Sequence, residues 1–385
     1  MRRGIAELPL HGGHVPYWLA SRMRKLAKIV VRLIVDEYGT LGLLERLADP
    51  VWFQALNNLI GMDWDSSGST TVTSGILKEV LQREQVGVWA AGGKGAKSRA
   101  TPTELREICG RLGLDSESYV KASLLVAKVD TVALQAGYQL YHHMFFVDSE
   151  GRWTVVQQGM NPAVKMARRY HWFSERISNF TVEPHAGISG VRESFALNTI
   201  ARKVDEYRLA LVDLAKDNPA SVERDLMTAL AVSRGFRTLV SYRPYACRDA
   251  TRIVRRYRSL GKLELNRRAL ELARELSASS YDELLLVRGL GPSTLRALSL
   301  VLELVYDVNP SWRDPVTHPP DPFKFAYAVG GKDGVPFPVD KKTYDELISL
   351  LEKLVEKSRG DKDVAKRVTI LTRKWYPPPE DKVPT

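Results

Sequence analysis

A group of polar residues in the first half of the chain offers the side chains that phosphodiester hydrolysis needs. Two of them, Asp130 and Lys128, interrupt an apolar segment, and pairs of histidines and glutamines follow in YHHM and VVQQGM. Carboxylates and histidines can hold a divalent metal or activate water, and a cation can stabilise the charge that develops on phosphate. The candidate catalytic residues are Asp130, Lys128, His142, His143, Gln157 and Gln158. We predict a metal-dependent nuclease site with Mg²⁺ or Mn²⁺ held by Asp130 and His142, and no organic cofactor is indicated.

Other polar residues of the first half match no catalytic signature. They are Asp63 and Asp65 in DWDSSG, Lys94, Lys97 and Arg99 in GGKGAKSR, Arg168, Arg169 and His171 in ARRYHW, and His185 in EPHAG. Neither the phosphate-binding G-x-x-x-x-G-K-[ST] loop nor H-E-x-x-H is present. A structural role as turn, cap or strand residues therefore stays open for each of them.

A second motif, in the last third of the chain, has the features of a phosphate-binding helical hairpin. Residues 281–306 contain two apolar helical segments joined by Gly289, Leu290 and Gly291. Glycines let the backbone approach a ligand, and Pro292 suits the first turn of a helix whose unpaired N–H groups attract phosphate. The pattern predicts a helix-hairpin-helix that binds nucleic acid, most favourably DNA, through Arg288, Gly289, Leu290, Gly291, Ser293, Thr294 and Arg296. A hairpin that only packs in the core is the alternative.

A strongly basic segment precedes this hairpin. Residues 234–268 hold eleven Lys and Arg against two acids, so that they carry +9 of the net charge of +11. We expect Arg252, Arg255 and Arg256 to enlarge the nucleic-acid footprint, with simple solvation of a helix face as the alternative.

The elements that must position these residues change in type along the chain. Helical periodicity over Tyr17–Tyr38 ends at Gly39, and a second helix is predicted over 115–137. The segments YQLYHHMFFV and RWTVVQQGM flank DSEG, which predicts a β-hairpin; if Val147 pairs with Arg152, His142 lies opposite Gln157. From Glu193 the pattern is almost entirely helical.

These patterns predict an α+β protein. We expect a mixed N-terminal domain with a β-hairpin or sheet (residues 1–190), an all-α domain that contains the helix-hairpin-helix (191–308), and a Pro-rich loop, C-terminal helix and tail (309–385). The 385 residues include 44% hydrophobic residues and no long apolar run, so we expect a cytoplasmic protein with no membrane partner. The two cysteines, Cys109 and Cys247, form no CxxC pair. Oligomeric state is left open.

Two other functions in nucleic-acid processing compete with the nuclease. Helices, a hairpin and a later aspartate also resemble the helix-hairpin-helix DNA glycosylases, for which Asp340 is the nearest match in this chain. Asp340 lies 49 residues beyond Gly291, and Ser293 stands where bifunctional members carry lysine. A helix N-cap is the alternative role for Asp340. The third possibility is a non-catalytic DNA binder that recruits other repair proteins.

Several segments taken together resemble one prokaryotic protein family. They are DWDSSG, GGKGAKSR, AKVDTVALQAGYQLYHHMFFV, VVQQGMN, ARRYHW, PHAGISG and GGKDGVPFPVD. As a group they are similar to the archaeal and bacterial family called domain of unknown function 763. The resemblance spans most of the chain and implies a two-part organisation. It supplies no catalytic residues.

Overall fold

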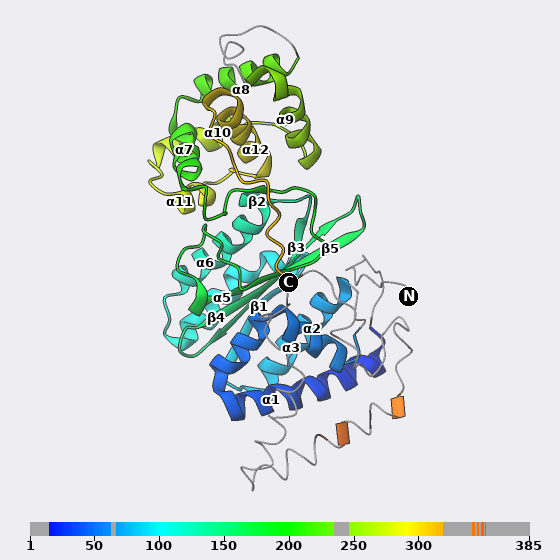
Figure 1. Ribbon diagram of the computed structural model, residues 1–385. Helices are drawn as coiled ribbons and strands as arrows, with labels where there is room; N and C mark the ends of the chain where they lie inside the picture. Colours follow the sequence, from blue (N-terminus) through cyan, green and yellow to red (C-terminus); the bar gives the residue numbers. More distant parts are fainter. Residues whose placement is uncertain are drawn as a thin grey trace, which may run out of the picture.

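A computed structural model describes residues 15–62, 67–234 and 246–318, with positions 341, 342, 345, 348, 349 and 351. Within these residues the protein has the predicted α+β fold, in which a five-stranded sheet lies between helices and a group of further helices caps one end (Figure 1). Asp63, Asp65, Asp340 and the predicted C-terminal tail lie outside the described residues.

The sheet is antiparallel throughout, with strand order β1-β3-β4-β5-β6. Its strands are β1 (Val88–Lys94), β3 (Gln139–Asp148), β4 (Trp153–Asn161), β5 (Met166–Phe173) and β6 (Gly187–Ser189). A separate short pair joins β2 (Leu134–Gln135) to β7 (Leu197–Asn198). The central strands are buried on both faces, since helices cover the sheet above and below.

The β3–β4 hairpin is present, but its register differs by one residue from the one predicted. Val147 pairs with Trp153, which places His142 opposite Gln158 and His143 opposite Gln157. Asp148 still belongs to the ladder, with its N–H bonded to Arg152 O at 3.0 Å, and Gly151 turns the chain at φ +83°. The connection therefore has three residues instead of four, because a left-handed glycine closes a three-residue loop.

One face of the sheet is covered by α1 (Tyr17–Ala48), α2 (Pro50–Leu59) and α3 (Ser67–Glu84). The helix expected to end at Gly39 does change direction there, at φ 69°, but it continues as a second helical segment to Ala48. Met144, Phe146 and Val156 point into the core on this face. We call it the α3 face.

The other face packs against α5 (Thr101–Leu112) and α6 (Ser116–Lys128), which follow the short α4 (Ala96–Arg99). Asp115 caps α6 by accepting a hydrogen bond from Glu117 N. Beyond Lys128 the helix widens into a π-helical turn, Val129–Ala133, and then enters β2. Phe145, Val155 and Trp172 line this α6 face.

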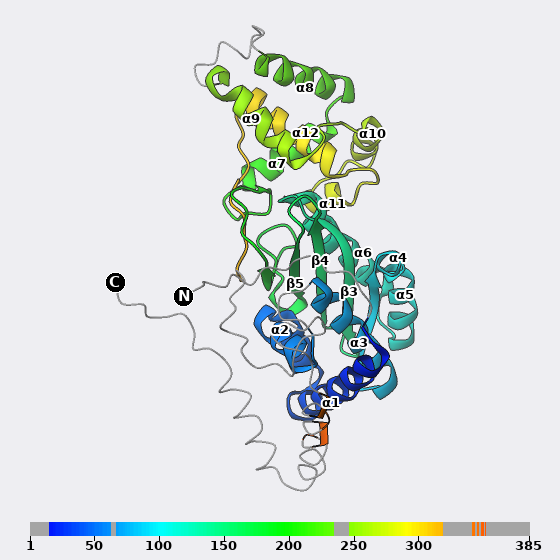
Figure 2. The same ribbon diagram turned by 90° about the vertical axis from the view of Figure 1, so that its right-hand side faces the viewer.

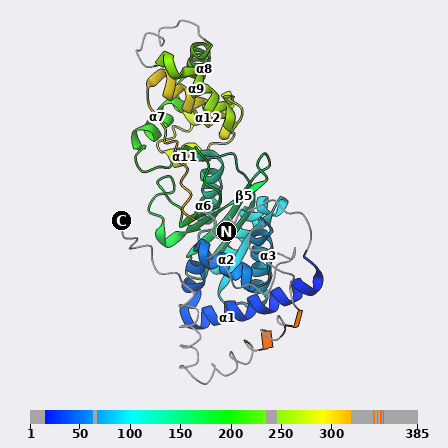
Figure 3. The same cartoon turned by 45° about the vertical axis from the view of Figure 1, so that its right-hand side comes forward.

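The remaining helices form the cap at one end of the molecule, where Figures 1 and 2 both place them. They are α7 (Asp205–Lys216), α8 (Pro219–Ser233), α9 (Ala246–Leu260), α10 (Arg267–Glu275), α11 (Tyr281–Leu286) and α12 (Pro292–Val301), and a π-helical turn over Leu302–Tyr306 follows. Figure 3 shows α11 next to the end of α6. The apolar core is continuous from the α6 face into these helices.

The chain returns to the sheet after the helical cap. Asn198 bridges to Ser311, and Ser189 to His318. Arg168 and Asp314 form an ion pair whose side chains are both fully buried, with Nη2 and Oδ2 2.6 Å apart. None of the helices in the described residues is long and apolar enough to cross a membrane.

Candidate functional site

Asp130 lies at the centre of a buried polar network on the α6 face. The π-helical turn carries its side chain inward, where the residue is 0% exposed. Its Oδ2 accepts hydrogen bonds from Gln157 Nε2 at 2.5 Å and Trp172 Nε1 at 2.9 Å, and His185 Nε2 donates to Oδ1 at 2.5 Å. Three donors from three separate segments therefore hold the carboxylate in one orientation.

The network continues from Gln157 to His143 and Ser123 on the same α6 face. His143 Nδ1 donates to Gln157 Oε1 at 2.6 Å, and Ser123 Oγ lies 2.8 Å from His143 Nε2. Burial lowers the pKa of His143, while its hydrogen bond to Gln157 and the charge of Asp130 act in the opposite direction. With Nδ1 protonated, the neutral ring accepts the Ser123 hydroxyl proton at Nε2. The network thus runs from Ser123 to His185.

His185 is the member of this network nearest to solvent. Its side chain is 5% exposed, and its ring packs against Trp172 with centroids 4.5 Å apart. Because Asp130 accepts from Nε2, the Nδ1 atom is left without a hydrogen-bond partner among the described residues. An aspartate that orients one ring nitrogen while the other remains open is the arrangement found in histidine general bases.

The structure corrects the grouping of His142 and Gln158 with Asp130. Neighbouring strand residues point to opposite faces, so His142 and Gln158 lie on the α3 face while His143 and Gln157 meet Asp130. Gln158 instead accepts from Thr70 Oγ1 and donates to Ser67 O at 2.8 Å. Burial lowers the pKa of His142 to about 3, and the charges of His143, Lys94 and Arg169 act in the same direction. His142 is a neutral ring on the far side of the sheet.

The metal site predicted at Asp130 and His142 is corrected by the same geometry, since two side chains on opposite faces cannot share one ion. Over residues 15–62, 67–234 and 246–318, no group of three or more His, Cys, Asp or Glu is placed to hold a metal. The Asp130 carboxylate instead accepts hydrogen bonds from three N–H groups. The partial positive charge on these groups would repel a cation.

Lys128 has a different position from the one predicted as well. Its Nζ donates to Leu290 O at 2.6 Å, away from the Asp130 carboxylate and toward the α11–α12 turn. Burial lowers its pKa. Gln135 reaches the same turn, with Nε2 3.2 Å from Pro292 O. Lys128 therefore connects the π-helical turn to the helical cap.

The α11–α12 turn has the conformation that its glycines predict. Gly289 adopts φ +85°, and a Cβ there would lie 2.8 Å from Asn266 Nδ2. Leu290 is 0% exposed and packs inside the turn. The N–H groups of Gly289, Gly291 and Ser293 have no hydrogen-bond partner in the described part of the chain, and none of these residues is buried. Arg288 beside them is exposed.

Two of the residues expected to contact phosphate point into the protein instead. Arg296 is 8% exposed and donates to Gln135 Oε1 at 2.5 Å and to Lys262 O at 3.1 Å. Thr294 is 2% exposed and donates to Glu264 O at 3.3 Å. In this conformation both side chains attach the basic segment to the hairpin, so they are not available to a backbone phosphate.

The basic segment lies next to the turn. Asn266 Nδ2 donates to Gly289 O at 3.1 Å. Of the three predicted arginines, Arg255 is exposed, Arg252 pairs with Asp249 at 2.8 Å, and Arg256 lies over the Trp312 ring at 4.6 Å. The tertiary structure thus places basic side chains of α9 and its following loop on the helical cap that also carries the turn.

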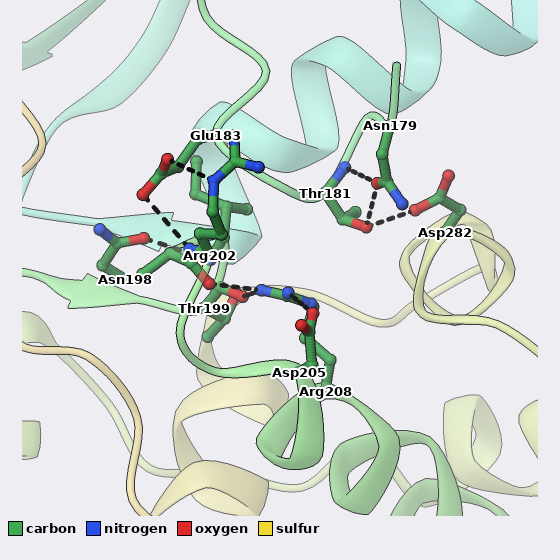
Figure 4. A network of polar contacts seen from close by, with 11 residues as sticks. Asn179, Thr181, Glu183, Asn198, Thr199, Arg202, Asp205, Arg208 and Asp282 are labelled. Atoms are coloured by element: carbon green, nitrogen blue, oxygen red, sulfur yellow. Dashed lines mark hydrogen bonds and ion pairs between the residues drawn. The ribbon is translucent and has the colours of Figure 1, made fainter. Parts of the chain in front are cut away.

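A polar junction ties the loop before α7 to the helical cap (Figure 4). Thr181 Oγ1 donates to Asp282 Oδ1 of α11 at 2.7 Å, and Arg208 of α7 donates to Thr199 O at 2.9 Å. Thr199 Oγ1 in turn bonds Ala133 O at 2.8 Å, at the end of the π-helical turn. The hairpin and the Asp130 segment are therefore held by one set of contacts.

Sequence reasoning did not connect His185, Trp172 or Ser123 with Asp130. His185 is 55 positions from Asp130, and only the folding of the 174–187 loop over β5 brings them together. A tryptophan in a buried strand gives no sign that its N–H serves a carboxylate. The one available signal was His185 in the segment PHAG, which has no helical or strand periodicity.

Comparison with known protein families identifies the chain. Residues 4–339 match the family described as Protein of unknown function (DUF763). No curated protein matches the sequence. No solved structure matches it either. Because the match covers most of the 385 residues, including the sheet, the Asp130 network and the α11–α12 turn, the chain belongs to the DUF763 family.

Proposed function

We propose that this protein binds DNA through the α11–α12 turn. The observation that carries the proposal is the set of N–H groups at Gly289, Gly291 and Ser293, residues that are not buried; these groups have no partner in the described part of the chain and stand beside exposed Arg288. Free amides at a helix N-terminus attract phosphate oxygens, and a glycine turn lets the backbone come close to them. Such contacts hold the backbone without distinguishing sequence.

The basic segment supports the same surface. Arg255 and Arg258 of α9 and Lys262 after it are exposed, and Asn266 ties this segment to Gly289. Several exposed cations beside a phosphate-binding turn give affinity that falls steeply with salt. The proposal therefore covers the α11–α12 turn together with the α9–α10 segment.

Gly291→Ala tests the turn without disturbing the fold. Gly291 has φ −115°, and an added Cβ meets no atom within 4 Å, so the variant should fold normally. The methyl group would nevertheless stand between the backbone and a phosphate. An amide hydrogen bond to a charged group contributes about 1.5–3 kcal/mol, so we expect about tenfold or greater loss of DNA affinity by fluorescence anisotropy.

Gly110→Ala is the matched control, because Gly110 lies on α5 with equally open space at its Cβ. It should leave DNA affinity unchanged. Arg288→Ala should lower the slope of log K against log salt by about 1, and Arg111→Ala on α5 should not. Wild-type affinity in Gly291→Ala, or a salt slope that Arg288→Ala leaves unaltered, would refute the proposal.

The Asp130–His185 pair favours a second candidate function, hydrolysis of phosphodiester bonds during DNA processing or repair. In this mechanism His185 Nδ1 takes a proton from water and the hydroxide oxygen bonds to phosphorus. The bond from phosphorus to the leaving sugar oxygen breaks, that oxygen takes a proton from solvent, and His185 returns its proton to solvent. Asp130 orients the ring through the 2.5 Å bond to Nε2. Gln157 and Trp172 position Asp130.

Incubation with labelled single-stranded, duplex and branched DNA, with and without Mg²⁺ or Mn²⁺, tests this function. His185→Gln should abolish cleavage while retaining DNA binding, because His185 lies outside the α11–α12 turn. His142→Asn, on the opposite face, should still cleave. Binding without turnover on all three substrates would exclude the hydrolase and leave the non-catalytic DNA binder.

A further inference from the structure

Two adjacent arginines of β5 are both buried, yet within the described residues only one has a carboxylate partner. Arg168 points to the α6 face and pairs with Asp314 through two hydrogen bonds of 3.0 and 2.6 Å. Arg169 points to the α3 face and is 1% exposed. No Asp or Glu contacts Arg169 in the part of the chain that the structure describes.

The described residues that accept hydrogen bonds from Arg169 are all neutral. Its Nε donates to Thr70 Oγ1 at 2.8 Å, and its Nη2 donates to Gln54 Oε1 and Ser69 Oγ, both at 3.0 Å. Nη1 makes no hydrogen bond to a described residue. Burial lowers the pKa of Arg169 to about 9, and Tyr141 acts in the opposite direction. A charge removed from water without a counter-charge is costly, and among the described residues this guanidinium has only neutral hydrogen-bond acceptors.

The same space contains other buried nitrogens that make no hydrogen bond within the described part of the chain. They are Asn57 Nδ2, Asn58 Nδ2, both ring nitrogens of His142, and His171 Nε2. All belong to residues that are at most 1% exposed. Native proteins satisfy nearly all buried polar groups, so a cluster of this kind points to a missing ligand or ion.

Contacts place this cluster around Arg169. Asn58 Oδ1 accepts from Gln54, which also bonds Arg169, and Asn57 Oδ1 accepts from Thr73, one helical turn beyond Thr70. His142 reaches the same region across the sheet, because the register aligns His142, Gln158 and Arg169 as neighbours on one face. The amide nitrogens of Asn57 and Asn58 are donors, as is Arg169 Nη1.

We infer that an oxyanion, the phosphate or carboxylate group of a small molecule, binds between α2, α3 and the sheet, where Arg169, Asn57 and Asn58 donate to it. The negative charge of the oxyanion neutralises the Arg169 guanidinium, as the Asp314 carboxylate neutralises Arg168. His142 supplies one further donor from its neutral ring. This site uses residues on the α3 face, separate from the α11–α12 turn and from Asp130, so it is independent of the proposed DNA-binding function.

The test begins with full-length protein purified in chloride buffer. Anions released by denaturation are measured by ion chromatography and mass spectrometry, and the melting temperature is followed during titration with inorganic phosphate or with acetate, against sodium chloride of equal ionic strength. We expect either stoichiometric release of one oxyanion or a saturable rise of at least about 2 °C with phosphate or acetate. The anion that acts distinguishes the phosphate from the carboxylate source.

Two variants assign the effect to this site. Arg169→Met retains the length of the side chain without its charge, and it should abolish both the release and the thermal shift. If Arg169→Met does not fold, Asn58→Ala should weaken anion binding at least tenfold. Arg288→Ala should keep the full effect, because any anion bound at the α11–α12 turn is lost there. The inference is overturned if no oxyanion is released and no saturable shift of the melting temperature is seen. It is also overturned if the folded Arg169→Met variant shows the full effect. Where Arg169→Met does not fold, the full effect in Asn58→Ala overturns it.

Discussion

The buried Arg168–Asp314 pair should be a major determinant of stability, and Asp314→Ala is the perturbation that tests it. Asp314 accepts both guanidinium hydrogen bonds and also the Glu193 N–H at 2.7 Å. Both charged side chains are fully buried. Removing the carboxylate leaves the Arg168 charge in the interior without its carboxylate, although Val191 O still accepts a hydrogen bond and the Tyr138 ring remains close.

The expected loss follows from these contacts. Breaking one partner of a buried ion pair costs about 3–5 kcal/mol, because the remaining charge stays out of water. Chemical denaturation followed by circular dichroism should therefore show a free energy of unfolding lower by about 4 kcal/mol, and a markedly lower melting temperature. The segment 311–318, which Asp314 holds against the sheet, should open first.

A double variant separates the ion pair from packing. Arg168→Met with Asp314→Leu removes both charges and fills the space with apolar groups, so it should be more stable than Asp314→Ala alone. A loss below about 1 kcal/mol in Asp314→Ala would refute the reasoning. The reasoning is also refuted if the losses of unfolding free energy in Arg168→Met and in Asp314→Leu simply add up in the double variant, since the two charges then do not interact.

Other consequences concern the turn, the polar network and pH. Leu290→Ala should cost about 2–5 kcal/mol in chemical denaturation, because Leu290 is 0% exposed inside the α11–α12 turn; a surface-like loss below 0.5 kcal/mol, roughly, would contradict that packing. Gly289→Ala should destabilise by about 1–3 kcal/mol through its positive φ and the contact with Asn266, whereas Gly291→Ala should melt like wild type. Burial lowers the pKa of His142 to about 3 in the folded protein. As pH falls below the ordinary histidine pKa near 6.5, His142 is therefore protonated in the unfolded chain but not in the folded one. Stability should thus be full above that value and decline as pH falls toward about 3, by about 1.4 kcal/mol per unit for this residue, and His142→Asn should flatten the profile measured by urea denaturation.

Local signals in the sequence determined much of the architecture. The α+β composition, the β3–β4 hairpin and the helix start at Pro292 all follow from interactions within a few residues, and the structure confirms them. The helix predicted to end at Gly39 changes direction there but continues to Ala48. The DUF763 membership also rests on contiguous segments. Such features are predictable because helical periodicity, capping and glycine turns depend on neighbours in sequence.

Tertiary structure alone decided which of these residues meet. A one-residue difference at Gly151 sent His143 rather than His142 to Asp130, because side chains alternate along a strand. His185 reached Asp130 from 55 positions away, and Arg296 turned toward Gln135 from 161 positions away. These outcomes depend on sheet register and on how the helical cap docks, which no short pattern encodes. The sequence therefore determined which polar groups the protein has, and the packing of distant segments determined which of them form a site.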